Sequence, residues 1–235
     1  MSKKTMRKEC ITCDSREKSI FCHLENEALV QIDQQKNTNT YKKGQDLFLE
    51  GNPPFGLYCV NSGKIKIYKV GEDGKETIIR IASSGELLGH RSLFTNKPYN
   101  ASATVIEEAQ VCFLSKTTIN ELIQKNPSLS FEIINRLSVQ MGAAENRLVS
   151  LSQKNLRERF AELLLLLKES HGIPHPTGTK LDIRLTREEM ASMIGSATEN
   201  LIRLITEFKK DSLIEQEGKY LIITNSDKIE EIAHV

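Results

Sequence analysis

The chain has 235 residues, of which 27% are charged, and a formal net charge of +1. This length suits two domains and is too great for a lone nucleic-acid-binding module, while the near-neutral charge neither favours nor excludes nucleic acid. No run approaches the ~18–20 apolar residues of a membrane span, and the N-terminus lacks the apolar region of a signal peptide, so we expect a cytoplasmic protein without membrane contact.

The N-terminal segment, residues 1–26, is rich in cysteine. Five cysteines are present in the chain, and Cys10, Cys13 and Cys22 fall in its first 22 residues. An odd number of cysteines in a chain without an export signal argues against a disulfide framework. The segment has too little apolar content to fold unaided, so these thiols are not simply core side chains.

The middle of the chain is rich in short β-strand patterns. A short helix is expected around residues 25–34, and from Thr38 the apolar period changes to two. Short strands separated by glycines predict a barrel or jelly roll, with a hairpin tip at residues 69–74. The expected strand runs lie around Phe48 and at residues 57–60, 65–68, 77–81, 101–105 and 110–114.

A long helix is expected over residues 127–153, after a shorter helical stretch at 116–122. Its apolar residues recur at steps of three and four, the a/d rhythm of a coiled-coil seam. Polar flanking positions favour a homodimer helix over a helix packed on its own domain. The seam consists of Ile134, Leu137, Met141, Ala144, Leu148 and Leu151.

Two helices joined by a tight turn follow an amphipathic helix at residues 155–169, a loop at 172–178 and a short strand at 180–184. Thr186 with Glu189, and Ser196 with Glu199, match the capping-box pattern, and Gly195 lies in the turn between the two expected helices. The second helix has an apolar face of Leu201, Leu204, Ile205 and Phe208, and small Ala191 lies where the helices would cross.

A hairpin at residues 213–223 follows this pair of helices and turns at residues 217–218. Together they predict a winged helix-turn-helix, whose second helix would lie in the major groove of DNA. The predicted fold is therefore α+β. It comprises the cysteine-bearing segment (1–26), a β-roll (27–126), a dimerisation helix (127–153) and a winged helix-turn-helix domain (154–235).

This order of elements resembles the cyclic-AMP receptor protein and fumarate-nitrate regulator (CRP/FNR) family of bacterial transcription factors. The specific motifs are residues 56–63 with the following Lys-Ile-Lys-Ile, and residues 85–89, 185–191 and 198–203. The resemblance implies a cyclic-nucleotide-binding-like sensor domain and a homodimer that binds pseudo-palindromic double-stranded DNA, with RNA polymerase as a further partner. It implies no enzyme, and no phosphate loop or nucleophile elbow appears in the sequence.

The family's DNA-contacting pair, a Glu and an Arg four residues later, matches Glu199 and Arg203. Arginine can donate to guanine O6 and N7, and glutamate can accept from cytosine N4. Ile202 suits a thymine methyl, Thr198 a thymine methyl or a phosphate, and Arg187 resembles a phosphate contact of the family. The alternative is structural, because Glu199 would also serve a capping box and pair with Arg203 for about 0.2–0.5 kcal/mol.

The family's cyclic-AMP ligands are not matched here. Relatives that bind cyclic AMP have a glutamate directly after the Gly-Glu-x-x-Gly run and an arginine-serine pair further on. This chain has His90 at the first position and Asn100 and Ala101 at the second. The charge that would neutralise the cyclic phosphate is missing, so cyclic-AMP binding is not expected.

Oxygen-sensing members of the family hold a [4Fe-4S] cluster with three N-terminal cysteines and one in the β-roll. The resemblance implies Cys10, Cys13, Cys22 and Cys112 as ligands, although eight residues separate Cys13 from Cys22, more than in the best-known oxygen sensors. Cys59 lies in an apolar strand run and is interpreted as a core side chain.

Other interpretations of the cysteines remain open. The same four thiolates would hold tetrahedral zinc, the thiols could be redox-active without metal, and haem is an option because His90 lies near a haem ligand of one relative. The corresponding alternative function is an effector-binding cyclic-nucleotide-fold module with a structural zinc site.

Overall fold

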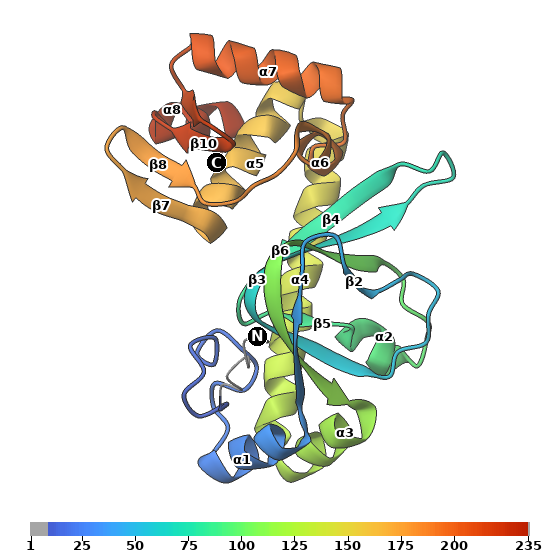
Figure 1. Cartoon of the computed structure of the whole chain (residues 1–235). Helices are drawn as coiled ribbons and strands as arrows, with labels where there is room; N and C mark the ends of the chain where they lie inside the picture. The colour runs from blue at the N-terminus through green and yellow to red at the C-terminus, as the bar shows by residue number, and fades with distance from the viewer. Residues whose placement is uncertain (1–8, 235) are drawn as a thin grey trace, which may run out of the picture. The chain divides into compact units, whose positions relative to one another are not determined.

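The computed structural model describes residues 9–234 and confirms an α+β protein with a β-roll, a long helix and a C-terminal helix-turn-helix domain (Figure 1). The chain divides into two compact units, one ending at Gln140 and the other beginning at Met141. The division falls within the long helix α4 (Pro127–Gln153), so both units include part of it. Among the described residues, no helix has the length and apolar character needed to cross a membrane.

The first unit is built on an antiparallel sheet in the order β1-β6-β3-β4, with β2 paired to β6 and β5 to β3. The order explains why residues far apart in sequence lie on adjacent strands. Its elements are α1 (Asn26–Gln35), β1 (Asn37–Tyr41), β2 (Asp46–Phe48), β3 (Gly56–Val70), β4 (Glu76–Ala82), β5 (Leu87–Leu88), α2 (His90–Thr95), β6 (Ser102–Ser115), α3 (Lys116–Lys125) and the first part of α4.

Two long strands replace four of the expected short ones. β3 contains the runs 57–60 and 65–68, and β6 contains 101–105, apart from its first residue, and 110–114. Between the two runs on each strand the alternation of apolar residues is interrupted. At this place the pairing of β3 with β6 shifts register, around Ser62 and Lys64. Gly63 lies there with φ +88°, and a Cβ would come within 2.4 Å of the Ala109 Cα. Only glycine fits this close approach of the two strands.

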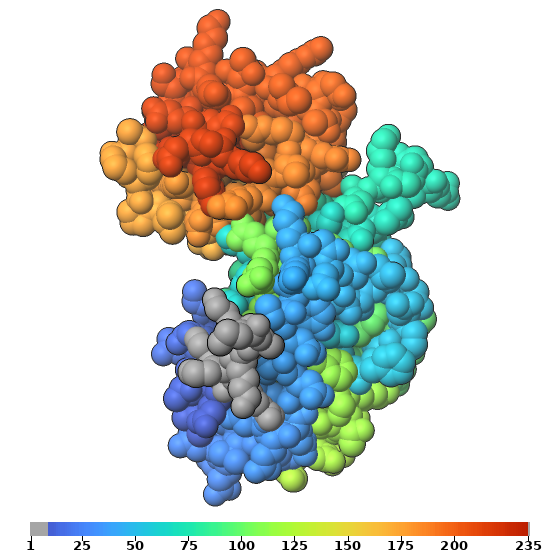
Figure 2. Space-filling model, in the orientation of Figure 1, coloured from blue at the N-terminus to red at the C-terminus, as the bar shows by residue number. Residues whose placement is uncertain are grey.

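The N-terminal segment contributes side chains to the core of this unit. Its surface, in dark blue, lies against the rest of the unit in Figure 2. Its side chains Ile20, Phe21 and Leu24 are buried in the same cluster as Leu129 and Ile133 of α4. The segment could not fold unaided, but it contributes enough apolar surface to dock on the β-roll and α4.

Most of the predicted seam on α4 is exposed. Leu148 is 69% exposed, and Ile134, Met141, Ala144 and Leu151 are exposed too. Leu137 differs because it is partly buried against the first unit's core. A further exposed aromatic residue, Phe131, adds to the uncovered apolar surface at the start of the helix.

The second unit combines helices with a small antiparallel sheet in the order β7-β8-β10-β9. Residues 172–178, expected as a loop, form β7 and the turn to β8, and a final helix was not predicted. Phe160 and Phe208 form the centre of its core with their rings edge to face. Beyond the end of α4, the elements are α5 (Leu156–His171), β7 (Gly172–His175), β8 (Gly178–Leu181), α6 (Arg187–Met193), α7 (Thr198–Lys210), β9 (Ile214–Glu217), β10 (Tyr220–Ile223) and α8 (Ser226–Ala233).

Candidate nucleic-acid interface and metal centre

The first helix of the helix-turn-helix begins as the sequence predicts. Thr186 caps α6, with its hydroxyl accepting from the Glu189 N–H at 3.0 Å while the Glu189 carboxylate accepts from the Thr186 N–H at 2.8 Å. The turn that follows requires Gly195, whose φ is +63°. The Ser196 N–H then donates to the Ala191 carbonyl at 2.9 Å, which fixes the turn against α6.

The second predicted capping box is wrong. The N-cap of α7 is Ala197, and no side chain caps the helix. The chain leaves the turn one residue later than expected, and the Ser196 hydroxyl donates instead to the Ala197 carbonyl at 3.3 Å. As a result, Glu199 is not engaged in capping.

The face of α7 opposite its core contacts is open to solvent. Leu201, Leu204, Ile205 and Phe208 are buried, as predicted. On the other side Glu199, Ile202 and Arg203 are exposed and Thr198 is half-buried. Within residues 9–234, Glu199 and Arg203 form no ion pair with each other, so the structural alternative for this pair is not realised here. These four residues are called the α7 contact face below.

Two basic side chains that the sequence patterns did not indicate as functional, Lys180 on β8 and Arg184 just after it, lie in the same unit. Arg184 donates to the Tyr220 hydroxyl at 2.7 Å, and the Lys180 ammonium lies 4.6 Å from the centre of the Tyr220 ring. Arg187, at the start of α6, donates to the Gln216 side chain of β9 at 2.9 Å. The only sequence signal for Lys180 and Arg184 was a pair of basic residues around a short strand.

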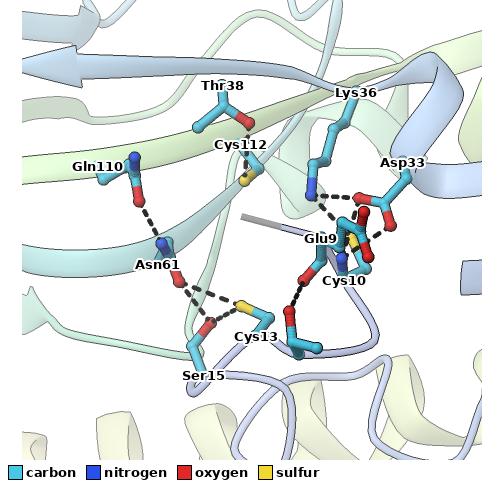
Figure 3. Close-up of polar contacts among 11 residues, drawn as sticks. Glu9, Cys10, Cys13, Ser15, Asp33, Lys36, Thr38, Asn61, Gln110 and Cys112 are labelled. Atoms are coloured by element: carbon cyan, nitrogen blue, oxygen red, sulfur yellow. Dashed lines mark hydrogen bonds and ion pairs between the residues drawn. The ribbon is translucent and has the colours of Figure 1, made fainter. Parts of the chain in front are cut away.

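The first unit contains a cavity that gathers cysteines from three parts of the chain. Figure 3 shows Cys10, Cys13 and Cys112 with their polar neighbours. The volume that the centre of a water molecule can occupy is about 30 Å³, within about 520 Å³ of empty space that includes open solvent. Cys10 and Cys13 reach it from the N-terminal segment and Cys112 from β6, as the resemblance implied, and Cys59 of β3 joins them. We call this space the cysteine cavity. Apolar residues Phe21, Leu29, Ile32 and Leu114 form much of the remaining wall.

A buried charged pair lies beside Cys10. The Lys36 ammonium, on a side chain that is only 2% exposed, lies 2.6 Å from Asp33 and donates to the Cys10 sulfur at 3.1 Å. Asp33 also accepts from the Cys10 N–H at 2.8 Å. Burial raises the pKa of the Cys10 thiol to about 12, and Lys36 opposes that increase. Asp33 adds to the increase, so the metal-free thiol is protonated, and the Lys36 charge would offset only part of the cost of forming a thiolate there.

Cys13 and Cys112 are held by polar neighbours. The Cys13 thiol donates to the Asn61 side chain at 3.1 Å and lies 3.0 Å from the Ser15 hydroxyl. The Cys112 sulfur lies 3.5 Å from the Thr38 hydroxyl, on the paired strand β1. These contacts hold the sulfurs at the cavity wall without joining any two of them (Figure 3).

Cys22 lies elsewhere. It is not among the residues that line the cavity. Its sulfur is within 4.8 Å of ligand atoms of His23 and of Glu132 on α4. The structure thus brings together three of the four expected ligands, and Cys59, which is buried in the core as predicted, also borders the cavity.

The donor set fits a polynuclear cluster better than a single zinc ion. Four sulfurs around one zinc, each about 2.3 Å from it, would be about 3.8 Å apart. Among the described residues, no three of the cavity cysteines have sulfurs within 4.8 Å of one another. The sulfurs as they stand are therefore not arranged for a single zinc ion, whereas an iron–sulfur cluster also takes four cysteine thiolates and has a larger core.

His90 is buried at the start of α2. Its Nε2 lies 3.3 Å from the Gln140 side chain, and Nδ1 is buried with no hydrogen-bond partner among the described residues. Burial, assisted by Arg80, lowers the pKa of His90 to about 4. The imidazole is therefore neutral at neutral pH and offers no charge to a phosphate.

Comparison with known proteins gives matches along most of the chain. Residues 38–126 match the cyclic nucleotide-binding domain, and residues 158–232 match the Crp-like helix-turn-helix domain.

Individual relatives match over most of the length of both chains. The CRP-like cAMP-activated global transcriptional regulator of Mycobacterium tuberculosis is 27% identical over 210 residues, which cover 89% of this chain and 94% of that protein. The fumarate and nitrate reduction regulatory protein of Vibrio cholerae is 28% identical over 227 residues, covering 96% and 90%. The structure of the c-di-GMP responsive global regulator CLP of Xanthomonas campestris matches with a TM-score of 0.75 at 22% identity, covering 86% of this chain and 100% of that one.

Proposed function

The chain belongs to the CRP/FNR family of DNA-binding transcription regulators, which are not enzymes, and from this membership we propose a homodimeric regulator controlled by an iron–sulfur cluster. The dimer would bind a palindromic DNA site, and the cluster would respond to oxygen or to redox conditions. The observation that supports this control most directly is the convergence of Cys10, Cys13 and Cys112 on one cavity.

DNA contact is assigned to the α7 contact face. Arg203 would donate to guanine, Glu199 would accept from cytosine, and Ile202 would pack on a thymine methyl. Thr198 at the helix start and Arg187 on α6 would contact the backbone of the DNA. The support for these roles is that Glu199, Ile202 and Arg203 are exposed while the opposite face is buried.

Dimerisation is assigned to the exposed seam of α4. Apolar side chains at coiled-coil spacing that are left uncovered within one chain favour association with a second copy. A two-fold dimer would present two α7 helices to half-sites about one helical turn, ~34 Å, apart. RNA polymerase is the further partner expected of such a regulator.

The cluster is assigned to the cysteine cavity. Cys10, Cys13 and Cys112 would supply three of its thiolates, and when bound the cluster would supply an iron centre whose integrity depends on oxygen. Lys36 would place its positive charge beside the Cys10 thiolate, and the apolar wall would limit water access to the sulfurs. Tetrahedral zinc, bare redox thiols and haem are the alternatives, and the spacing of the sulfurs favours the cluster over zinc.

The N-terminal segment would transmit the state of the cavity to α4. Arg136 of α4 donates to the Lys18 carbonyl, and Ile20 and Phe21 share a core with Leu129 and Ile133. Metal bound to Cys10 and Cys13 would hold this segment in place, and loss of metal would release it. The start of the dimerisation helix would then lose part of its packing.

Cyclic-AMP control is not proposed, although one relative is described as cAMP-activated. The position of the family's ribose-binding glutamate is occupied by His90, which is neutral and packed beside Gln140. Asn100 and Ala101 replace the arginine-serine pair and provide no charge for a cyclic phosphate.

The proposal is tested by purifying the protein without oxygen and measuring iron, sulfide, the visible spectrum and DNA affinity before and after exposure to air. Binding sites would first be selected from random-sequence DNA. We expect a brown protein with about four iron and four sulfide per chain and a change of DNA affinity in air. A colourless, zinc-loaded protein with the same DNA affinity in both conditions would refute control by a cluster.

A further inference from the structure

The cysteine cavity contains one thiol that the family pattern does not assign. Cys59 lines the cavity together with Cys10, Cys13 and Cys112, whereas Cys22 does not. Four of the five cysteines are thus gathered at one site, which is the number of thiolates that a [4Fe-4S] cluster needs.

Strand pairing fixes the position of Cys59. β3 and β6 are antiparallel, and Cys59 lies directly opposite Cys112. Side chains of directly opposed residues project from the same face of a sheet, with Cβ atoms about 4.5–5.5 Å apart. The neighbouring pair, Val60 and Val111, is buried in the core on the other face. The alternation of the strands therefore directs both thiols towards the N-terminal segment.

The position of Cys22 is determined by its neighbours in sequence. Ile20 and Phe21 are buried in the core, and the Cys22 N–H donates to the Ser19 carbonyl at 3.3 Å. This conformation places the Cys22 sulfur beside His23 and Glu132. Bringing it into the cavity would require Phe21, which itself lines the cavity, to move from the wall.

Given the cluster proposed above, we propose that Cys59 supplies its fourth thiolate, so that Cys10, Cys13, Cys59 and Cys112 are the ligands and Cys22 is not. This assignment rests on the proposed function and revises the ligand set of the family pattern. Two thiolates would come from the Cys-x₂-Cys pair of the N-terminal segment, and two from paired strands of the β-roll. Each thiol would release its proton to solvent on binding iron. The long spacing between Cys13 and Cys22 then has no bearing on ligation.

The test uses the full chain, reconstituted without oxygen with ferrous iron, sulfide and thiol, and compares Cys59→Ala with Cys22→Ala. We expect Cys59→Ala to lose at least about ten-fold in bound iron and sulfide together with the visible absorption, as for a missing ligand. Cys22→Ala should retain the content and spectrum of the wild type. Ile32→Val is the matched control, because it trims a buried side chain of the cavity wall without removing a thiol.

Two further measurements separate ligation from folding. Circular dichroism and thermal unfolding of the metal-free proteins should be closely similar for the wild type and Cys59→Ala. Alkylation with iodoacetamide, followed by mass spectrometry, should label Cys22 equally with and without the cluster, while Cys13 is protected only when it is bound.

The outcomes distinguish this assignment from the proposed function. If the wild-type chain forms the cluster, two results would overturn the ligand assignment alone. These are loss of the cluster in Cys22→Ala and retention of the cluster in Cys59→Ala. Protection of Cys22 on cluster formation would do the same. A wild-type chain that forms no cluster would overturn the proposed function, and this assignment with it.

Discussion

Replacing Arg203 by alanine tests the α7 contact face most directly. Arg203 is exposed and forms no ion pair with Glu199 within residues 9–234, so its removal breaks no pair of that kind in the free protein. A bidentate arginine–guanine contact contributes about 1–3 kcal/mol, which corresponds to about 5- to 140-fold in affinity. Because both subunits of a dimer lose it, and distant sites are additive, the expected loss is about 2–6 kcal/mol on a palindromic site.

The measurement is fluorescence anisotropy at one fixed salt concentration, with a site selected from random-sequence DNA and with a scrambled duplex. Arg203→Ala should lose affinity for the selected site while retaining affinity for the scrambled one. It should also no longer distinguish the site from a variant with the contacted guanine replaced. Arg187→Ala is the contrast, because loss of a phosphate contact should weaken both duplexes alike and reduce the salt dependence. Equal losses on both duplexes for Arg203→Ala would refute base contact by this residue.

Three further predictions concern assembly and stability. Leu148→Glu places charge on the exposed seam and should convert dimers to monomers in sedimentation velocity. Asn146→Glu adds the same charge off the seam and should leave the dimer intact. A Leu148→Glu protein that is still a dimer would contradict dimerisation through the seam. Gly195→Ala should cost about 1–2 kcal/mol and lower the thermal midpoint, because φ is +63° and the new Cβ would lie 3.0 Å from Leu151. The depressed pKa of His90, about 4, means that the unfolded chain binds its proton first as the pH falls. The titration of His90 therefore lowers the free energy of unfolding by about 2 kcal/mol between pH 7 and pH 5. His90→Gln should remove this part of the pH dependence when the free energy of unfolding is measured by urea denaturation at both pH values.

Local patterns in the sequence predicted the helix-turn-helix well, because the relevant interactions lie within a few residues. The Thr186–Glu189 box and the Gly195 turn formed as expected. The incorrect prediction that Ser196 caps α7 has the same local origin. Either of two consecutive residues can occupy the N-cap, and only the geometry of the turn selects Ala197. The exposure of Glu199 and Arg203 follows from that selection.

The location of Cys59 was less accessible to sequence reasoning. An apolar strand pattern indicates burial but does not identify the opposing strand or the face on which a thiol lies. Cys59 and Cys112, which pair between β3 and β6, are separated by more than fifty residues of sequence. The pairing of these strands also includes register shifts that the alternating pattern does not reveal. The same limit applies to Cys22, which is close to Cys13 in sequence but does not line the cavity, because its neighbours Ile20 and Phe21 are buried in the core.

The core that Ile20 and Phe21 share with Leu129 and Ile133 has a thermodynamic consequence. The N-terminal segment and the base of α4 are parts of one cooperative structure, so a change in the stability of either changes that of the other. Such coupling is reciprocal: in the proposed regulator, whatever free energy metal binding would add to dimerisation, dimerisation would add to metal binding. A DNA site that favours the proposed dimer would therefore also raise its affinity for metal, so occupancy of the DNA site would change the sensitivity of the proposed sensor.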